Sequence, residues 1–211
     1  MNTGFFTEDL SDETKTTFVA SINISLLSAE PEKRGVLCFD VNEQGLIAIG
    51  QTGSQDKEIC VYTSQGEFLY GYTFNCTQSF CVEWDEQHVN IYFIRSDVII
   101  SLDSDGNILD IKAVQDTIDN NSYRNSLLYS TTRAVGNTTY LIRNDMGIFN
   151  WIATSYSQIV TIDATGSESI IYDVNSMQLT KTIVTISLIC VFVFVAVAVV
   201  IWQFIKLRRG N

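Results

Sequence analysis

Three acidic residues beside a tryptophan are the first candidates for chemistry in this sequence. Glu83, Asp85 and Glu86 flank Trp84, and a pair of carboxylates is the usual apparatus for hydrolysing glycosidic bonds. That reaction requires two carboxylates held at a fixed separation across a cleft, whereas sequence neighbours at the edge of a strand more often form a solvated face. We therefore expect a solvated cluster and keep a membrane-bound hydrolase that uses acidic residues as the alternative.

The cysteines and the single histidine, His88, could serve a metal or a nucleophile. Zinc sites favour closely spaced cysteine pairs, and the sequence contains no Cys-x-x-Cys. Cysteines inside apolar runs usually behave as small buried hydrophobic residues, although an even number in one domain also permits two disulfides. We expect no metal site, no cofactor and no catalytic residue, and both cysteine states stay open. The four cysteines concerned are Cys38, Cys60, Cys76 and Cys81.

The run from Asp103 to Asn107 begins like a calcium-binding loop, because it reads Asp-Ser-Asp-Gly-Asn. An EF-hand loop needs Gly at its sixth position and Glu at its twelfth, but Ile108 and Val114 stand there. Gly106 instead suits a hairpin turn that requires a positive φ angle. The sequence therefore predicts a turn here.

Specific recognition is best placed in the segment from Tyr123 to Phe149. This segment carries Arg124, Arg133 and Arg143 within an otherwise acidic domain. The simpler interpretation is that these cations balance nearby acidic side chains.

The charge balance narrows the possible partners. The chain has a net charge of −11, and four of its 13 basic residues flank an apolar stretch near the carboxyl end, which leaves nine basic against 24 acidic residues in residues 1–180. An acidic surface repels phosphate backbones, so nucleic-acid binding is not expected. With 46% hydrophobic residues the chain is expected to fold, and its length fits one domain.

The stretch from Thr182 to Ile205 is predicted to cross a membrane. Its 24 residues carry no charge, and 16 of them are Val, Ile, Leu or Phe. A helix of this length reaches about 36 Å, enough to cross a hydrocarbon core of about 30 Å. The chain is therefore expected to be a single-pass membrane protein with the lipid bilayer as one partner.

The residues that flank this span predict its orientation. Basic flanks are retained in the cytoplasm, and more basic residues follow the span than precede it. This places the β domain outside and the carboxyl terminus in the cytoplasm. The amino terminus shows no export signal, so a tail-anchored protein with a cytosolic domain is the alternative. The flanking residues are Lys181, Trp202, Lys206, Arg208 and Arg209.

The region from Gly35 onward is predicted to be an antiparallel β domain. Short β-branched and aromatic runs alternate with Gly, Asn, Asp and Ser about every ten residues. The runs repeat with a period of about 40 residues: Ile59, Ser64 and Gly66 correspond to Ile99, Ser104 and Gly106. A third copy at 159–166 follows about 20 extra residues, which we place in 120–136. The predicted strands span residues 36–41, 46–49, 59–62, 68–74, 80–84, 89–94, 98–102 and 108–114.

This repeat, apolar runs followed by Ser-x-Gly and then Leu, resembles the blades of NHL-like β-propellers. The resemblance implies an all-β fold of about three propeller-like blades, fewer than a closed ring needs. Either the amino-terminal arm completes a blade, or the sheets stack in an open array that must protect its edges. The chain is also similar to an uncharacterised family of bacterial single-pass membrane proteins, which implies no function.

The sequence thus predicts five parts. They are a polar, loosely ordered arm over 1–34 with one strand in 18–27, a β-repeat domain over 35–173, a tether over 174–181, a transmembrane helix over 182–205 and a basic tail over 206–211. The expected function is non-enzymatic binding, sensing or assembly, with a protein or small-molecule ligand on the β domain. An accessory subunit of a membrane complex is a further alternative.

Overall fold

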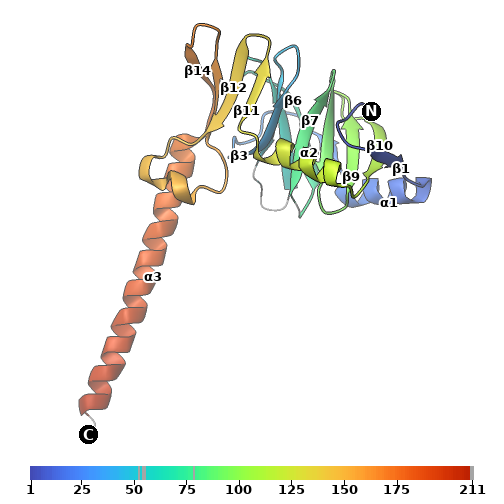
Figure 1. The fold of residues 1–211 in the computed structure, drawn as a ribbon. Helices are drawn as coiled ribbons and strands as arrows, with labels where there is room; N and C mark the ends of the chain where they lie inside the picture. Colours follow the sequence, from blue (N-terminus) through green and yellow to red (C-terminus); the bar gives the residue numbers. More distant parts are fainter. Residues whose placement is uncertain (52, 54–55, 78, 210–211) are drawn as a thin grey trace.

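The computed structural model describes residues 1–51, 53, 56–77 and 79–209, and the side chain of Arg208 is outside this description. The chain forms three antiparallel sheets and one long carboxyl-terminal helix (Figure 1). This confirms the predicted β-rich domain followed by one long apolar helix.

The first sheet has the strand order β2-β6-β5-β4-β3, and the second has the order β1-β10-β9-β8-β7. Each is built on four strands that are consecutive in sequence, and the predicted strands match them to within a few residues. The first four are β3 (Val36–Val41), β4 (Ile47–Gln51), β5 (Asp56–Tyr62) and β6 (Phe68–Asn75). The second four are β7 (Phe80–Asp85), β8 (His88–Phe93), β9 (Val98–Leu102) and β10 (Ile108–Val114).

The third sheet is a four-stranded meander, β11-β12-β13-β14. Its strands are β11 (Thr132–Val135), β12 (Thr138–Arg143), β13 (Gln158–Ile162) and β14 (Glu168–Asp173). The extra residues placed in 120–136 are therefore only partly an insertion. Helix α2 (Ile118–Tyr129) is the added element, and β11 is the first strand of the third sheet.

Matched turns confirm the sequence repeat. Gly66 and Gly106 each have φ of +81°, and Gly166 in the third sheet has φ of +82°. Asp103 Oδ1 accepts hydrogen bonds from the amides of residues 105 and 107, and Asp163 Oδ1 accepts the same pair from residues 165 and 167. The Asp103 run is thus a hairpin turn, as the sequence predicts.

The sheets pack in a row with the first sheet in the middle (Figure 1). Successive residues of a strand point to opposite faces, and along β5 Ile59 packs toward the second sheet while Cys60 packs toward the third. Because both faces are covered, every residue of β4 is buried. Among the described residues the row does not close into a ring.

The amino-terminal arm is more ordered than predicted. Residues 12–22 form helix α1 (Asp12–Ile22), so half of the segment 18–27, for which one strand is expected, is helical. Ser11 Oγ accepts from the Thr14 amide at 3.2 Å, and Asp12 and Glu13 occupy the first turn, which are standard signals for a helix start. Flanking segments add edge strands: β1 (Thr7–Asp9) pairs with β10, and β2 (Ser25–Leu26) pairs with β6.

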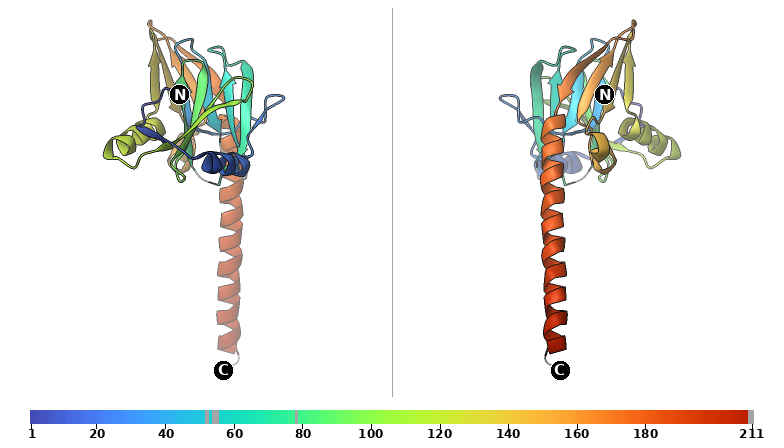
Figure 2. Two further views of the ribbon diagram at one scale, coloured as in Figure 1. Left: turned by 90° about the vertical axis from the view of Figure 1, so that its right-hand side faces the viewer. Right: turned by 90° about the vertical axis from the view of Figure 1, so that its left-hand side faces the viewer.

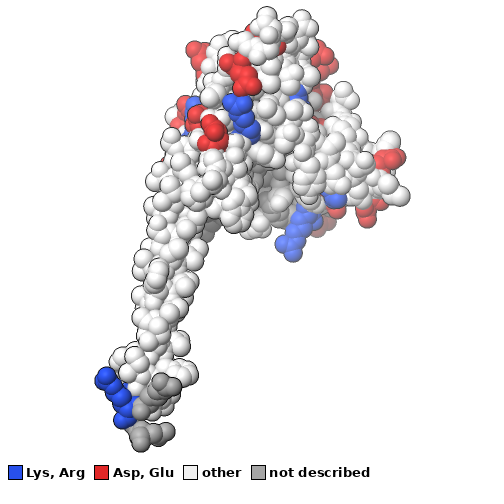
Figure 3. Space-filling model, turned by 60° about the vertical axis from the view of Figure 1, so that its left-hand side comes forward, with Lys and Arg blue, Asp and Glu red and all other residues white. Residues whose placement is uncertain are grey.

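The carboxyl-terminal helix α3 spans Asn175–Arg209. Among the described residues, α3 is the one helix that is both long enough and apolar enough to cross a membrane. Its surface is uncharged along most of its length, and basic side chains appear at its carboxyl end (Figure 3). Residues 175–181, predicted as a separate tether, are the first turns of this helix. Gln178 Nε2 donates to Ser155 Oγ at 3.0 Å, which ties these turns to the domain.

Candidate functional site

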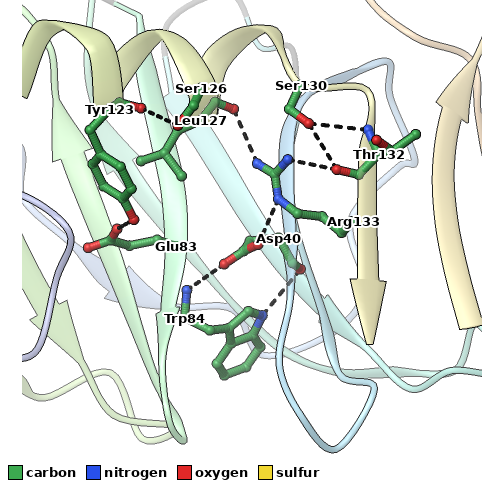
Figure 4. A network of polar contacts seen from close by, with 9 residues as sticks. All are labelled: Asp40, Glu83, Trp84, Tyr123, Ser126, Leu127, Ser130, Thr132 and Arg133. Atoms are coloured by element: carbon green, nitrogen blue, oxygen red, sulfur yellow. Dashed lines mark hydrogen bonds and ion pairs between the residues drawn. The ribbon is translucent and has the colours of Figure 1, made fainter. Parts of the chain in front are cut away.

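Arg133, one of the three candidate recognition residues, is held inside the domain. Its side chain is 15% exposed, and its Nε donates to Asp40 Oδ1 at 2.9 Å. Its other nitrogens donate to the carbonyl oxygens of Thr132 and Leu127, and its guanidinium lies 5.3 Å from the centre of the Phe39 ring (Figure 4). Each of its three guanidinium nitrogens thus donates one hydrogen bond within the protein.

Asp40 joins the three sheets at this point. Its side chain on β3 pairs with Arg133 of β11, and its second carboxylate oxygen accepts from the Trp84 amide of β7 at 2.8 Å. The Asp40 carbonyl also accepts from the Trp84 indole nitrogen at 3.2 Å (Figure 4). Asp40 therefore acts as a structural junction of the first, second and third sheets.

The expectation that the acidic cluster is solvated is wrong for Glu83. Glu83 is 5% exposed; it accepts from Tyr123 Oη at 2.6 Å and from Asn90 Nδ2 at 3.2 Å. Burial raises the pKa of this carboxyl. Asp85 instead accepts from the amide of Asn2 near the surface. Glu83 is buried by α2, which covers that face of the second sheet.

Arg124 and Arg143 have different partners from Arg133. Arg124 lies on α2 and hydrogen-bonds Tyr92, whereas Arg143 lies on β12 and pairs with Glu168 at 2.9 Å. Each of the three arginines therefore contacts a different side chain of the domain. The interpretation that they balance local acids holds for Arg133 and Arg143.

The four cysteine thiols of the domain are buried. Burial raises the pKa of Cys38 and of Cys60 to about 12, so neither ionises near neutral pH. Cys38, Cys60 and Cys81 are not joined in disulfides, and Cys76 is buried as well. In the part of the chain that the structure describes, no group of three or more His, Cys, Asp or Glu residues is arranged to hold a metal ion.

The most distinctive surface is the outer face of the third sheet. The register Leu141–Val160–Ile170 forms a row across β12, β13 and β14 on the face opposite the core residue Ile159. Ile170 is 53% exposed. The ion pair Arg143–Glu168 lies on the same face, and this side of the domain is largely uncharged around a small group of charges (Figure 3).

The corresponding end of the row, the outer face of the second sheet, is covered. Phe5 of the amino-terminal segment contacts Tyr92 and Tyr123, with ring centres 4.6 and 4.8 Å apart. Asn90 donates to the carbonyl of Asn2, and α2 packs over β7. One end of the row of sheets is therefore capped by this chain. At the other end Ile170 is exposed, although Val160 beside it is fully buried. Strand alternation in the sequence shows that β14 has an apolar position at Ile170, but it cannot show which face is capped.

Two grooves lie beside the third sheet. One, of about 380 Å³, lies between its turns and those of the first sheet and is lined by hydroxyl side chains, including Ser64, Thr138 and Thr161. The other, of about 470 Å³, lies where α3 leaves the domain and is lined by Ile152, Lys181 and other residues.

The membrane-flank residues lie on α3. Lys181 is exposed in its second turn, and Lys206 Nζ lies 5.4 Å from the centre of the Trp202 ring near the other end. Arg209 ends the helix, and the side chain of Arg208 lies outside the described residues. Neither a scan against protein-family models nor a search of curated proteins finds a match to this chain.

Proposed function

We propose that this protein is a membrane-anchored assembly module whose contact surface is the outer face of the third sheet. In this proposal the three sheets are propeller-like blades of an incomplete array, and a partner protein packs where the next blade would lie. The observation that carries the proposal is the contrast between the two ends of the row. One end is sealed by Phe5, Tyr123 and α2, and the other exposes Ile170.

The chemistry of the open face supports a protein partner. Ile170 is exposed on this face, Val160 beside it is fully buried, and the Arg143–Glu168 pair lies across the same strands. An exposed aliphatic side chain next to a charged pair fits the mixed apolar and polar surface of a protein interface. Sheets that pack face to face bury such rows about 10 Å apart. A hydrolase is not proposed, because both oxygens of Glu83 and both oxygens of Asp40 already accept hydrogen bonds.

We further propose that the domain lies outside the cytoplasm. The basic residues after the span support this orientation, and a tail-anchored arrangement is the alternative. The test is protease treatment of intact cells that carry epitopes at both ends. Loss of the amino-terminal epitope alone supports the proposed orientation, and protection of that epitope until the membrane is opened refutes it.

Site-directed photo-cross-linking in native membranes tests the contact surface. A photoreactive amino acid replaces Ile170 on the open face, or Leu109 on β10, which is similarly exposed at 50%. A discrete adduct is expected from position 170 and not from position 109, and Leu141→Asp should abolish it. An adduct of twice the chain's mass identifies the partner as a second copy. Equal labelling from both positions, or none from 170, would refute the proposal.

A further inference from the structure

A short 3₁₀ helix, η1 (Gly147–Ile152), exposes two large apolar side chains. Trp151 is 84% exposed and Ile148 is 79% exposed, which places them among the most exposed apolar residues of the domain. Single exposed hydrophobic residues are ordinary, but a tryptophan and an isoleucine on one short turn form a local patch. Neither side chain packs into the core of the domain.

The position of η1 indicates what it contacts. Ile152 and Ala153 line one side of a groove whose other side is formed by Met177, Lys181 and Thr182 of α3. Thr182 is the first residue of the uncharged stretch. Figure 1 and the right-hand view of Figure 2 place this part of the chain beside the first turns of α3.

Contacts within the loop and to α3 fix this position. The Met146 amide donates to Asn150 Oδ1 at 2.7 Å, and Asn150 Nδ2 donates to the Asn144 carbonyl at 3.3 Å. Asn175 Nδ2 donates to the Asp145 carbonyl, and Gln178 Nε2 to Ser155 Oγ. Segments on both sides of η1 are therefore hydrogen-bonded to the start of α3. These bonds fix the position of the patch along the axis of the membrane-spanning helix.

The length of the uncharged part of α3 places the patch at the level of the lipid headgroups. The 24 uncharged residues reach about 36 Å, whereas the hydrocarbon core is about 30 Å thick and the interfacial layers add about 5 to 7 Å on each side. Thr182 therefore lies within or next to one interfacial layer, and Ile152 beside it lies at the same level. Tryptophan is enriched in this layer because its ring is amphipathic.

We propose that η1 is a second membrane contact, in which Trp151 and Ile148 enter the interfacial layer of the same leaflet that α3 enters. Lys181 lies at this level and suits lipid phosphates, with Arg34 in the adjoining groove. Glu32 and Asp145 also lie nearby, so the apolar pair rather than net charge provides the attraction. The occupant of this surface is the bilayer itself.

Fluorescence of the full-length protein in phosphatidylcholine vesicles tests this proposal. In a Trp202→Phe background two tryptophans remain, and subtracting the spectrum of the Trp151→Phe variant isolates Trp151 from Trp84. Nitroxide-labelled lipids with the label near the headgroup should quench Trp151, iodide in the water should not, and its emission should be blue-shifted. A matched control places tryptophan at Asn137 in the Trp151→Phe, Trp202→Phe variant, because the β11–β12 turn lies at the other end of β12.

The control tryptophan should respond to iodide and not to the labelled lipid. If Trp151 responds as the Asn137→Trp control does, the proposal is wrong. A second variant, Ile148→Asp, should shift the emission of Trp151 toward that of the control while circular dichroism stays unchanged. An unchanged Trp151 spectrum in this variant would likewise contradict membrane insertion by η1.

Discussion

The junction at Asp40 gives the sharpest test of how the three sheets are held together. Replacing Arg133 with Leu removes the donors to Asp40 at 2.9 Å, to the Thr132 carbonyl at 3.0 Å and to the Leu127 carbonyl at 3.4 Å. It also leaves the Asp40 carboxylate, 16% exposed, with the hydrogen bond from the Trp84 amide. Removing one partner of a fully buried ion pair costs about 3 to 5 kcal/mol. For this slightly exposed pair we expect a loss of about 2 to 4 kcal/mol.

A matched control separates this effect from the loss of a surface charge. The pair Arg143–Glu168 has the same 2.9 Å separation, but its side chains are 36% and 49% exposed, so Arg143→Leu should cost less than about 1 kcal/mol. Urea unfolding of each full-length variant in detergent gives the free energy, and Trp84 fluorescence reports locally on the junction. If Arg133→Leu lies within about 0.5 kcal/mol of the unmodified protein, the junction does not hold the sheets together.

Three further outcomes are expected. Gly166→Ala should lower the free energy of unfolding by about 1 to 2 kcal/mol, because its backbone is left-handed. Gly66→Ala should lower it further, because an added Cβ would lie 2.4 Å from the Ile171 carbonyl oxygen. Equal losses of the two variants in urea unfolding would contradict the proposed clash at Gly66. Burial raises the pKa of the Glu83 carboxyl above its ordinary 4.5. The stability that the protonated Glu83 contributes is therefore present below pH 4.5 and is lost as pH rises through the folded-state pKa. In melting curves measured over a pH series, Glu83→Gln should reduce this loss of stability with rising pH. Full-length protein should resist carbonate extraction from membranes and deletion after Thr180 should release the domain, so carbonate-soluble full-length protein would disprove the span.

The sequence predicts the strands of the first two sheets well because their turns are marked locally. Gly66 and Gly106 occupy positions that need a positive φ, and the apolar runs between the turns match β3 to β10 closely. The span was equally clear, because 24 uncharged residues outweigh any local preference. Helix α1 was missed, although Ser11 followed by Asp12 and Glu13 signals a helix start, because the apolar residues from Phe18 onward suggested strand alternation.

The candidate sites were harder to predict because they depend on which face of a sheet is covered. The acidic side chain of Glu83 on β7 is of a type that is usually solvated, yet α2 and its residue Tyr123, 40 residues later in the sequence, bury it. Arg133 is similar, since its partner Asp40 lies 93 residues away. Neither long-range pairing leaves a signal in one sequence. The exposure of Trp151 depends on how η1 leaves β12 and could not be read from residue type.

The two proposed surfaces belong to one sheet, and this relation bears on how a partner would be met. Strand β12 leads directly into η1, and β13 returns from it. If η1 rests on the bilayer, the central strands of the third sheet point toward the membrane at that end, and the open face with Ile170 is directed sideways, along the membrane surface. A partner anchored in the same membrane would then approach this face already oriented. Such pre-orientation lowers the entropy lost on association, so an interface of modest apolar area could suffice where two freely tumbling domains would need a larger one.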